Sequence, residues 1–182
     1  FSHLAYDDPI VFPGKPGVSH LHMFFGNDEA NAFSTGDTIL NKGSSTCNGH
    51  ELNRTGYWVP AVFDAAGNVR IPDRMFVYYK SFGPASPVTQ IYPKDKSLRI
   101  ISGAANAEQP QSADFVMHWN CGNRIAGENQ AVIPACDDGG VVGNIKFPQC
   151  WDGQNGWMAG VAHMAMSPAY YSGTCPASHP IV

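Results

Sequence analysis

Short apolar runs separated by turn residues extend along the chain and predict strands rather than helices. Aromatic and β-branched residues gather in these runs, and Gly, Pro, Asn and Asp stand between them. We expect strands at 20–25, 57–63, 69–71, 76–79, 98–101, 115–119 and 140–147. A short helix is expected only within 28–42, where Gly36 interrupts the run and no clear 3.6-residue period is present. With no internal repeat and no linker, the pattern indicates one mainly β domain over 1–182: a sandwich, jelly roll or distorted barrel with long loops and few helices.

The run Ser19-His20-Leu21-His22 carries the strongest chemical signal. In an extended strand, side chains two residues apart leave the same face, so two imidazoles would lie side by side, about 6–7 Å apart at the backbone. Neutral imidazole is a common metal ligand and a common general base near neutral pH. A catalytic or metal site is one interpretation. The other is that both rings lie on a solvated face or bond within a polar core.

The composition fits a turn-rich β protein with a polar rather than ionic surface. Charged residues make up 14% of the chain, and there are 19 glycines and 14 prolines. The net charge of −4 and the lack of a run of Lys or Arg argue against nucleic acid as a partner. No apolar stretch approaches the roughly 20 residues that a membrane helix needs. We expect a monomer, and we expect the chain from Phe1 to be a processed or trimmed product.

The five cysteines predict disulfides. None belongs to a Cys-x-x-Cys pair, so a zinc ribbon or a thioredoxin-like motif is not supported. In a chain poor in charge and rich in Gly and Pro, disulfides formed in an oxidising compartment are the better interpretation. The odd count leaves one thiol unpaired or one partner missing. The sequon Asn53-Arg54-Thr55 is compatible with secretion.

Further candidates lie in the last third of the chain. Asp152 is expected in a tight turn at a strand end, where a carboxylate acts as a ligand or general acid, or caps the turn through its own backbone. His163 stands among small and apolar residues, as a core histidine or as a functional group with a tuned pKa. Trp157 and the pair Tyr170-Tyr171 are candidates for a surface that stacks on sugars, with ordinary packing as the alternative.

Nine phrases of the sequence together resemble one family. They are Phe1-Ser2-His3, Asp7-Asp8-Pro9-Ile10-Val11, Pro16-Gly17-Val18-Ser19-His20-Leu21-His22, Phe24-Phe25-Gly26-Asn27, Tyr57-Trp58-Val59-Pro60-Ala61, Val77-Tyr78-Tyr79, Phe147-Pro148-Gln149-Cys150-Trp151-Asp152-Gly153, His163-Met164-Ala165 and Cys175-Pro176-Ala177-Ser178-His179-Pro180. The chain resembles the DUF1996 family of secreted fungal and actinobacterial proteins nearly from end to end. The resemblance implies an extracellular location. Some members carry WSC or carbohydrate-binding modules beside this domain, which by analogy implies a polysaccharide partner.

The resemblance also bears on the odd cysteine. Family members usually have a cysteine shortly before the Phe-Ser-His phrase, so a parent with six cysteines and three bridges is expected. We expect the pairs Cys121–Cys136 and Cys150–Cys175, because each closes a short local loop, and each would contribute about 3 kcal/mol by restricting the unfolded chain. Cys47 would then lack its partner. Connectivity stays open at this point, because sequence alone does not prove it.

The chain departs from the family at two places. The segment 154–162 lacks the acidic and histidine positions that members commonly have there, and Met23 replaces an acidic residue often found after the second histidine. If those groups complete a metal shell or an acid–base pair, this chain is a divergent or specialised member. Direct transfer of the family's chemistry is therefore in doubt.

The first functional hypothesis is a secreted enzyme that cleaves an extracellular polysaccharide, with a site lined by His20, His22, Asp152 and His163. Cleavage by β-elimination needs a base and a group that neutralises the uronate carboxylate, for which Arg99 or a bound metal is the candidate. Hydrolysis normally needs two facing carboxylates, for which Asp152 and Asp8 are the candidates.

Two further hypotheses belong to other classes. In a non-catalytic carbohydrate-binding module, the aromatic residues would carry the affinity, and the histidines would be structural or hold a fixed metal. In a metal-dependent redox protein, His20, His22 and His163 would supply three nitrogen ligands, which suit copper or zinc. Calcium is the third divalent metal that we consider as a cofactor.

Overall fold

A computed structural model describes residues 1–49, 53–78, 98–104, 107, 109, 116–122, 129–137, 140–167 and 174–180. The chain divides into two compact units. The N-terminal unit comprises Phe1–Lys80 and Pro93–Leu98, and the C-terminal unit comprises Ser81–Tyr92 and Arg99–Val182. Within the described ranges, strands outnumber helices, which confirms the prediction of a mainly β protein with few helices.

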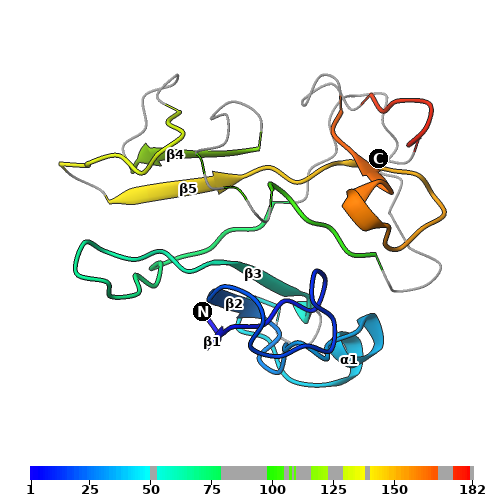
Figure 1. Ribbon diagram of the computed structural model, residues 1–182, viewed down its shortest axis with the longest axis horizontal. Coiled ribbons are helices and arrows are strands. Elements are labelled where there is room, and N and C mark those ends of the chain that lie inside the picture. Colours follow the sequence, from blue (N-terminus) through cyan, green and yellow to red (C-terminus); the bar gives the residue numbers. More distant parts are fainter. Residues whose placement is uncertain are drawn as a thin grey trace. The chain divides into compact units, whose positions relative to one another are not determined.

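The core of the N-terminal unit is a three-stranded antiparallel sheet. It consists of β1 (Leu4–Ala5), β2 (His22–Gly26) and β3 (Gly56–Pro60) in the order β1-β2-β3 (Figure 1). All five residues of the central strand are buried. The ring of Phe24 stacks on His3 at a centroid distance of 4.8 Å and on Trp58 at 5.6 Å. The central strand is thus held by aromatic contacts as well as by its two hydrogen-bonded neighbours.

Gly26 ends the central strand for a steric reason. Its φ is +78°, in the left-handed region that glycine tolerates best. A Cβ atom at this position would lie 2.0 Å from the carbonyl oxygen of Thr55. The close approach of the two backbones here therefore requires glycine.

The one α-helix of the described residues, α1 (Gly36–Asn41), lies inside the segment where a short helix was predicted. Thr35 caps its N-terminus by accepting a hydrogen bond from the Thr38 amide, and the Thr38 hydroxyl accepts in return from the Thr35 amide at 2.8 Å. Gly36 is the first helical residue rather than an interruption. No helix in the described part of the chain is long and apolar enough to cross a membrane.

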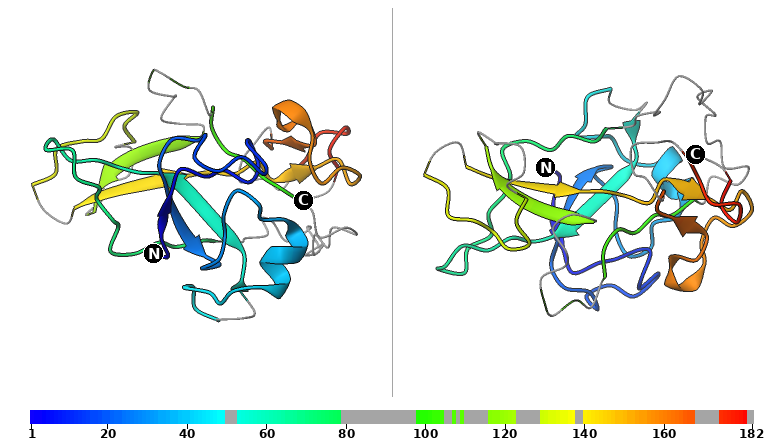
Figure 2. Two further views of the ribbon diagram at one scale, coloured as in Figure 1. Left: turned by 60° about the horizontal axis from the view of Figure 1, so that its bottom comes forward. Right: turned by 90° about the horizontal axis from the view of Figure 1, so that it is seen from above.

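Two antiparallel strand pairs build the C-terminal unit. The strand β4 (Met117–Cys121) pairs with β5 (Val141–Ile145), and β6 (Cys150–Trp151) pairs with β7 (Met164–Ala165), as Figures 1 and 2 show. A short 3-10 helix, η2 (Ala159–Val161), precedes β7. In β4 every second residue is buried, as expected for a strand with one covered face.

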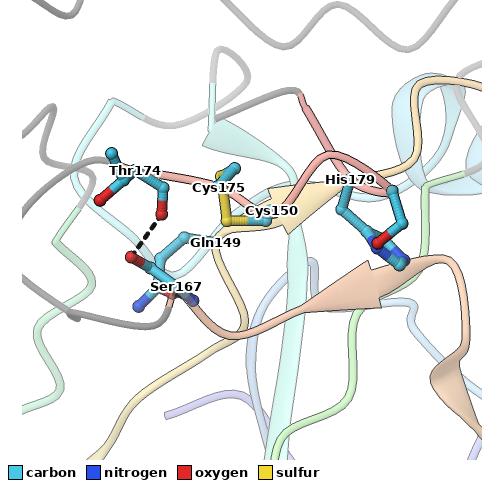
Figure 3. The surroundings of a disulfide bond; sticks show 7 residues. Gln149, Cys150, Ser167, Thr174, Cys175 and His179 are labelled. Carbon is cyan, nitrogen blue, oxygen red and sulfur yellow. Dashed lines mark hydrogen bonds between the residues drawn. A yellow bond between two sulfur atoms is a disulfide. The ribbon is translucent and has the colours of Figure 1, made fainter.

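Both predicted disulfides are present, and both lie in the C-terminal unit. Cys121 is bonded to Cys136 and Cys150 to Cys175, whereas Cys47 in the N-terminal unit is a free thiol. Figure 3 shows the second bridge, where the Ser167 hydroxyl donates a hydrogen bond to the Thr174 carbonyl at 2.7 Å. The bridge ties Cys175 to β6, and the hydrogen bond ties Thr174 to the segment that follows β7.

Two of the predicted strands are wrong over the described residues. Residues 98–101 form no strand, because the main chain of Arg99 bonds elsewhere: its amide donates to Gly156 at 2.9 Å and its carbonyl accepts from the His163 ring. Residues 76–78 form no strand either, and Tyr79 lies outside the described residues. The predicted strand at 69–71 is reduced to an isolated bridge between Phe63 and Val69.

Candidate functional site

His22 begins β2 and is held in one orientation by the segment before β2. Its side chain is 3% exposed, its Nδ1 lies 2.8 Å from the carbonyl oxygen of Asp7, and the Ser19 hydroxyl lies 3.3 Å from the same nitrogen. Because a carbonyl oxygen only accepts, Nδ1 carries the proton that it donates to Asp7. The neutral ring therefore has its lone pair on Nε2, and no described residue makes a hydrogen bond to that atom.

The surroundings of His22 keep its ring neutral. Burial lowers its pKa, the hydrogen bond to Asp7 raises it, the neighbouring His20 lowers it, and the charge of Asp8 raises it; the net effect is a lowered pKa. The exposed ring of His20 lies beside it, at a centroid distance of 4.4 Å. The structure thus confirms that the two imidazoles lie side by side, and it gives one of them the protonation state of a general base.

Asp7 and Asp8 hold the loop that supports this pair. The Asp8 carboxylate is buried and accepts from the amides of Ile10 and Val11 through Oδ1. The Asp7 carboxylate accepts from the amide of Gly17 at 3.1 Å and from that of Ala32 at 2.9 Å. Both acids are therefore used to fix the backbone, and the Asp8 charge acts on His22 through space.

His163 in the C-terminal unit is fully buried, and the backbone occupies both of its nitrogens. Nε2 donates to the carbonyl of Arg99 at 2.7 Å, and Nδ1 accepts from the amide of Met158 at 3.3 Å. A ring bonded in this way is fixed in a single orientation. No nitrogen is left to exchange a proton with a substrate, so the geometry favours the core interpretation of His163.

Asp152 caps the turn that follows β6. Its Oδ1 accepts from the amides of Gln154 and Asn155 at 2.8 and 2.9 Å, and its Oδ2 accepts from the Asn155 side chain at 2.7 Å. Burial alone would raise the pKa of this carboxyl group, but the three hydrogen bonds outweigh burial and lower the pKa to about 2. At neutral pH Asp152 therefore has no proton to give as a general acid.

The candidate sugar-binding residues differ in how far they can be placed. Trp157 is half-buried and makes an edge contact with His163 at a centroid distance of 5.6 Å. Arg99 lies in the same unit. Its amide donates a hydrogen bond to the Gly156 carbonyl, and its carbonyl accepts one from the His163 ring. Tyr170 and Tyr171 lie outside the described residues.

Sequence reasoning found the two histidines but missed what fixes them. Ser19 stands three residues before His22 in the motif, and its hydroxyl lies beside the ring, a contact that the motif does not reveal. The Asp7 carbonyl is a backbone group 15 residues away, so no side-chain pattern marks it. Within either unit, the described residues include no group of three His, Cys, Asp or Glu side chains placed to hold a metal ion.

The fold and the site define a mainly β protein with two disulfides and a buried, neutral histidine beside an exposed one. Residues 8–182 match the family described as "Domain of unknown function (DUF1996)". The chain belongs to this family, as the sequence resemblance predicted. Comparisons with curated proteins and with solved structures give no match.

Proposed function

We propose that this protein is a secreted, monomeric enzyme that cleaves an extracellular polysaccharide, with His22 as its base. The observation that carries the proposal is the buried, neutral imidazole whose Nδ1 donates to Asp7, so that the basic lone pair is on Nε2. Secretion is supported by the two disulfides. The polysaccharide class is supported by analogy with carbohydrate-binding modules found beside this domain in the family.

Among the cleavage reactions, the geometry favours β-elimination from a uronate. His22 Nε2 would take the proton from the carbon next to the uronate carboxylate, and that C–H electron pair would form a carbon–carbon double bond. The bond to the glycosidic oxygen would then break, and the leaving oxygen would take a proton from His20 or from water. The adjacent rings, 4.4 Å apart, suit this pairing of base and acid.

Hydrolysis has weaker support. It normally uses two facing carboxylates, one of which must be protonated to act as the acid. The pKa of Asp152 is about 2, and the Asp8 carboxylate is bonded to two backbone amides. Asp152 therefore has no proton to give at neutral pH, and Asp8 is engaged in holding the backbone.

The test is turnover of three soluble polyuronates, namely alginate, pectate and glucuronan, followed by the ultraviolet absorbance of the unsaturated product. We expect the wild type to produce this absorbance with at least one of them. His22→Gln keeps an amide that can donate to the Asp7 carbonyl but has no basic nitrogen, so we expect about a 100-fold loss or more. The matched control is His179→Ala, because His179 is bonded to Ser178 and Ala162 in the C-terminal unit and should leave turnover unchanged.

Other outcomes separate the alternatives. New reducing ends without the absorbance would mean hydrolysis, and no product of either kind from the wild type would overturn the enzyme proposal. Equal turnover by the wild type and His22→Gln would remove His22 as the base.

A binding module is the second candidate, because the N-terminal unit displays an aromatic surface. The side chains of Phe76 and Tyr78 are 67% and 74% exposed, and their rings stack at 6.1 Å with an interplanar angle of 23°. Such a surface suits the apolar face of a sugar ring. Retention on a polysaccharide without turnover would favour this candidate.

For the fold, we likewise propose a single sandwich, jelly roll or barrel over residues 1–182.

A metal protein is the third candidate. His20 and His22 supply two imidazoles, and the lone pair on His22 Nε2 is of the kind that binds zinc or copper. The metal content of the purified protein tests it. Near-stoichiometric metal that is lost in His20→Ala and in His22→Gln would favour this candidate over the metal-free base.

A further inference from the structure

A second feature of the N-terminal unit lies outside the histidine pair. A cavity of about 130 Å³ opens between the turn 27–34 and the helix α1. The residues of its wall that matter here are Glu29, Asn31, Phe33, Ser34 and Lys42. None of the histidines that the structure describes lines it.

Hydrogen bonds link the residues that form the wall of this cavity into a framework. Asn27 is buried, and its side-chain amide donates to the carbonyls of Ile39 and Lys42 at the end of α1 while its oxygen accepts from the Glu29 amide. Asn31 bonds to Glu29, Phe33 and Ser34 through its side chain and backbone. The shape of the cavity is therefore set before any ligand arrives, which reduces the entropy lost on binding.

Three side chains on this framework are not used by the fold. Among the described residues, the Glu29 carboxylate and the Lys42 ammonium have neither a hydrogen bond nor an ion pair. Phe33 is 63% exposed in the same turn. A free acceptor, a free donor and an open aromatic face thus surround one small polar cavity.

We propose that this cavity binds one sugar residue of a polysaccharide. The aromatic face of Phe33 would pack on the apolar C–H face of the sugar, Glu29 would accept hydrogen bonds from its hydroxyls, and Lys42 would donate to its oxygens. A small ion of either sign would be attracted by one of these two groups and repelled by the other, whereas a sugar residue, a uronate included, offers hydroxyls to Glu29 and oxygens to Lys42. The choice of a polysaccharide rests on the proposed function, whereas the position of the site rests on the cavity alone.

The experiment measures binding rather than turnover. The full chain carrying His22→Gln is run by affinity electrophoresis through gels that contain glucuronan, pectate or a neutral β-glucan, so that cleavage does not remove the ligand. We expect retardation by at least one of the three. Phe33→Ala should weaken it about tenfold, the upper end expected of one aromatic contact. Glu29→Gln should weaken it by about fivefold or more.

The matched control is Phe63→Ala, because Phe63 is 52% exposed in the same unit and does not line the cavity. We expect it to change retardation less than about twofold. A loss in Lys42→Met that is confined to glucuronan and pectate would identify a uronate as the bound residue, and a loss on the β-glucan as well would identify a shared hydroxyl contact. Both losses support the site.

Two results overturn the inference: no retardation in any of the three gels, or retardation that Phe33→Ala and Glu29→Gln leave unchanged. Neither result depends on turnover. A protein that cleaves a polyuronate but shows unchanged retardation in these variants would refute the cavity and leave the proposed function standing. If retardation is lost in Phe33→Ala and the wild type shows no turnover, the cavity would stand and the proposed function would be refuted.

Discussion

Replacement of His163 by Ala separates the structural interpretation of this residue from a catalytic one. The ring is fully buried and bonds to the Arg99 carbonyl and the Met158 amide, so its removal leaves two part-buried backbone groups without these partners. For part-buried groups the cost lies near the lower end of about 1–3 kcal/mol each, and the cavity left by the ring adds to the loss. We expect the free energy of unfolding to fall by about 3–5 kcal/mol, a large part of the roughly 5–15 kcal/mol of a native protein.

The assay is urea unfolding followed by tryptophan fluorescence, to which Trp157 contributes because its ring touches His163. For a chain of 182 residues, the expected loss lowers the melting temperature by roughly 6–20 °C. His163→Gln can both donate to Arg99 and accept from Met158, so about half of the stability should return. The control is His179→Ala, because its ring is only half-buried and bonds one carbonyl, that of Ala162.

A loss below about 1 kcal/mol in His163→Ala would refute the reasoning, because the removal of a fully buried ring and of its two hydrogen bonds should cost more than that. If such a stable variant also lost turnover, His163 would belong to the chemistry of the site. If it lost stability and turnover together, the His163→Gln variant would decide, because it restores the two hydrogen bonds without restoring a basic ring.

Two further predictions concern the N-terminal unit. The lowered pKa of His22 means that the unfolded chain binds a proton at a higher pH than the folded chain, so stability is complete above about pH 6.5 and falls as the pH drops toward the folded pKa. Urea midpoints measured between about pH 7.5 and 5.5 should show this slope in the wild type and a flatter one in His22→Gln; equal slopes would contradict it. Without reductant, the denatured protein should react with one equivalent of a thiol reagent at Cys47, and Cys47→Ala with none. Three reactive thiols would mean that one of the two bridges had not formed.

The sequence predicted local features better than long-range ones. The alternation of β residues placed His20 and His22 side by side, although β2 begins only at His22. The short loops between cysteines predicted both bridges, because a loop of 15 or 25 residues closes readily. The helix α1 lies within the segment expected for it, whereas its cap, in which Thr35 and Thr38 bond to each other across one turn, was not predicted.

The failures have two physical origins: backbone groups that bond far along the chain, and hydrogen bonds of a turn that the sequence does not reveal. The apolar residues at 98–101 look like a strand, but Arg99 bonds to Gly156 and His163 instead of to a neighbouring strand. The sequence leaves the role of Asp152 open, because a carboxylate in a turn has the same sequence context whether it caps the turn or takes part in catalysis. Only its three hydrogen bonds, which lower the pKa to about 2, show the difference.

Because both disulfides lie in one unit, a reducing environment would affect the stability of the two units differently. Both bridges lie in the C-terminal unit, and the only cysteine of the N-terminal unit is unbonded. A reductant would therefore break both bridges of the part that holds Trp157 and Asp152, whereas within residues 1–182 no bridge joins the strands of the sheet that carries His22. Local opening would then begin in one unit first. Reduction would therefore destabilise one unit selectively, and the histidine pair in the other unit would keep its structure.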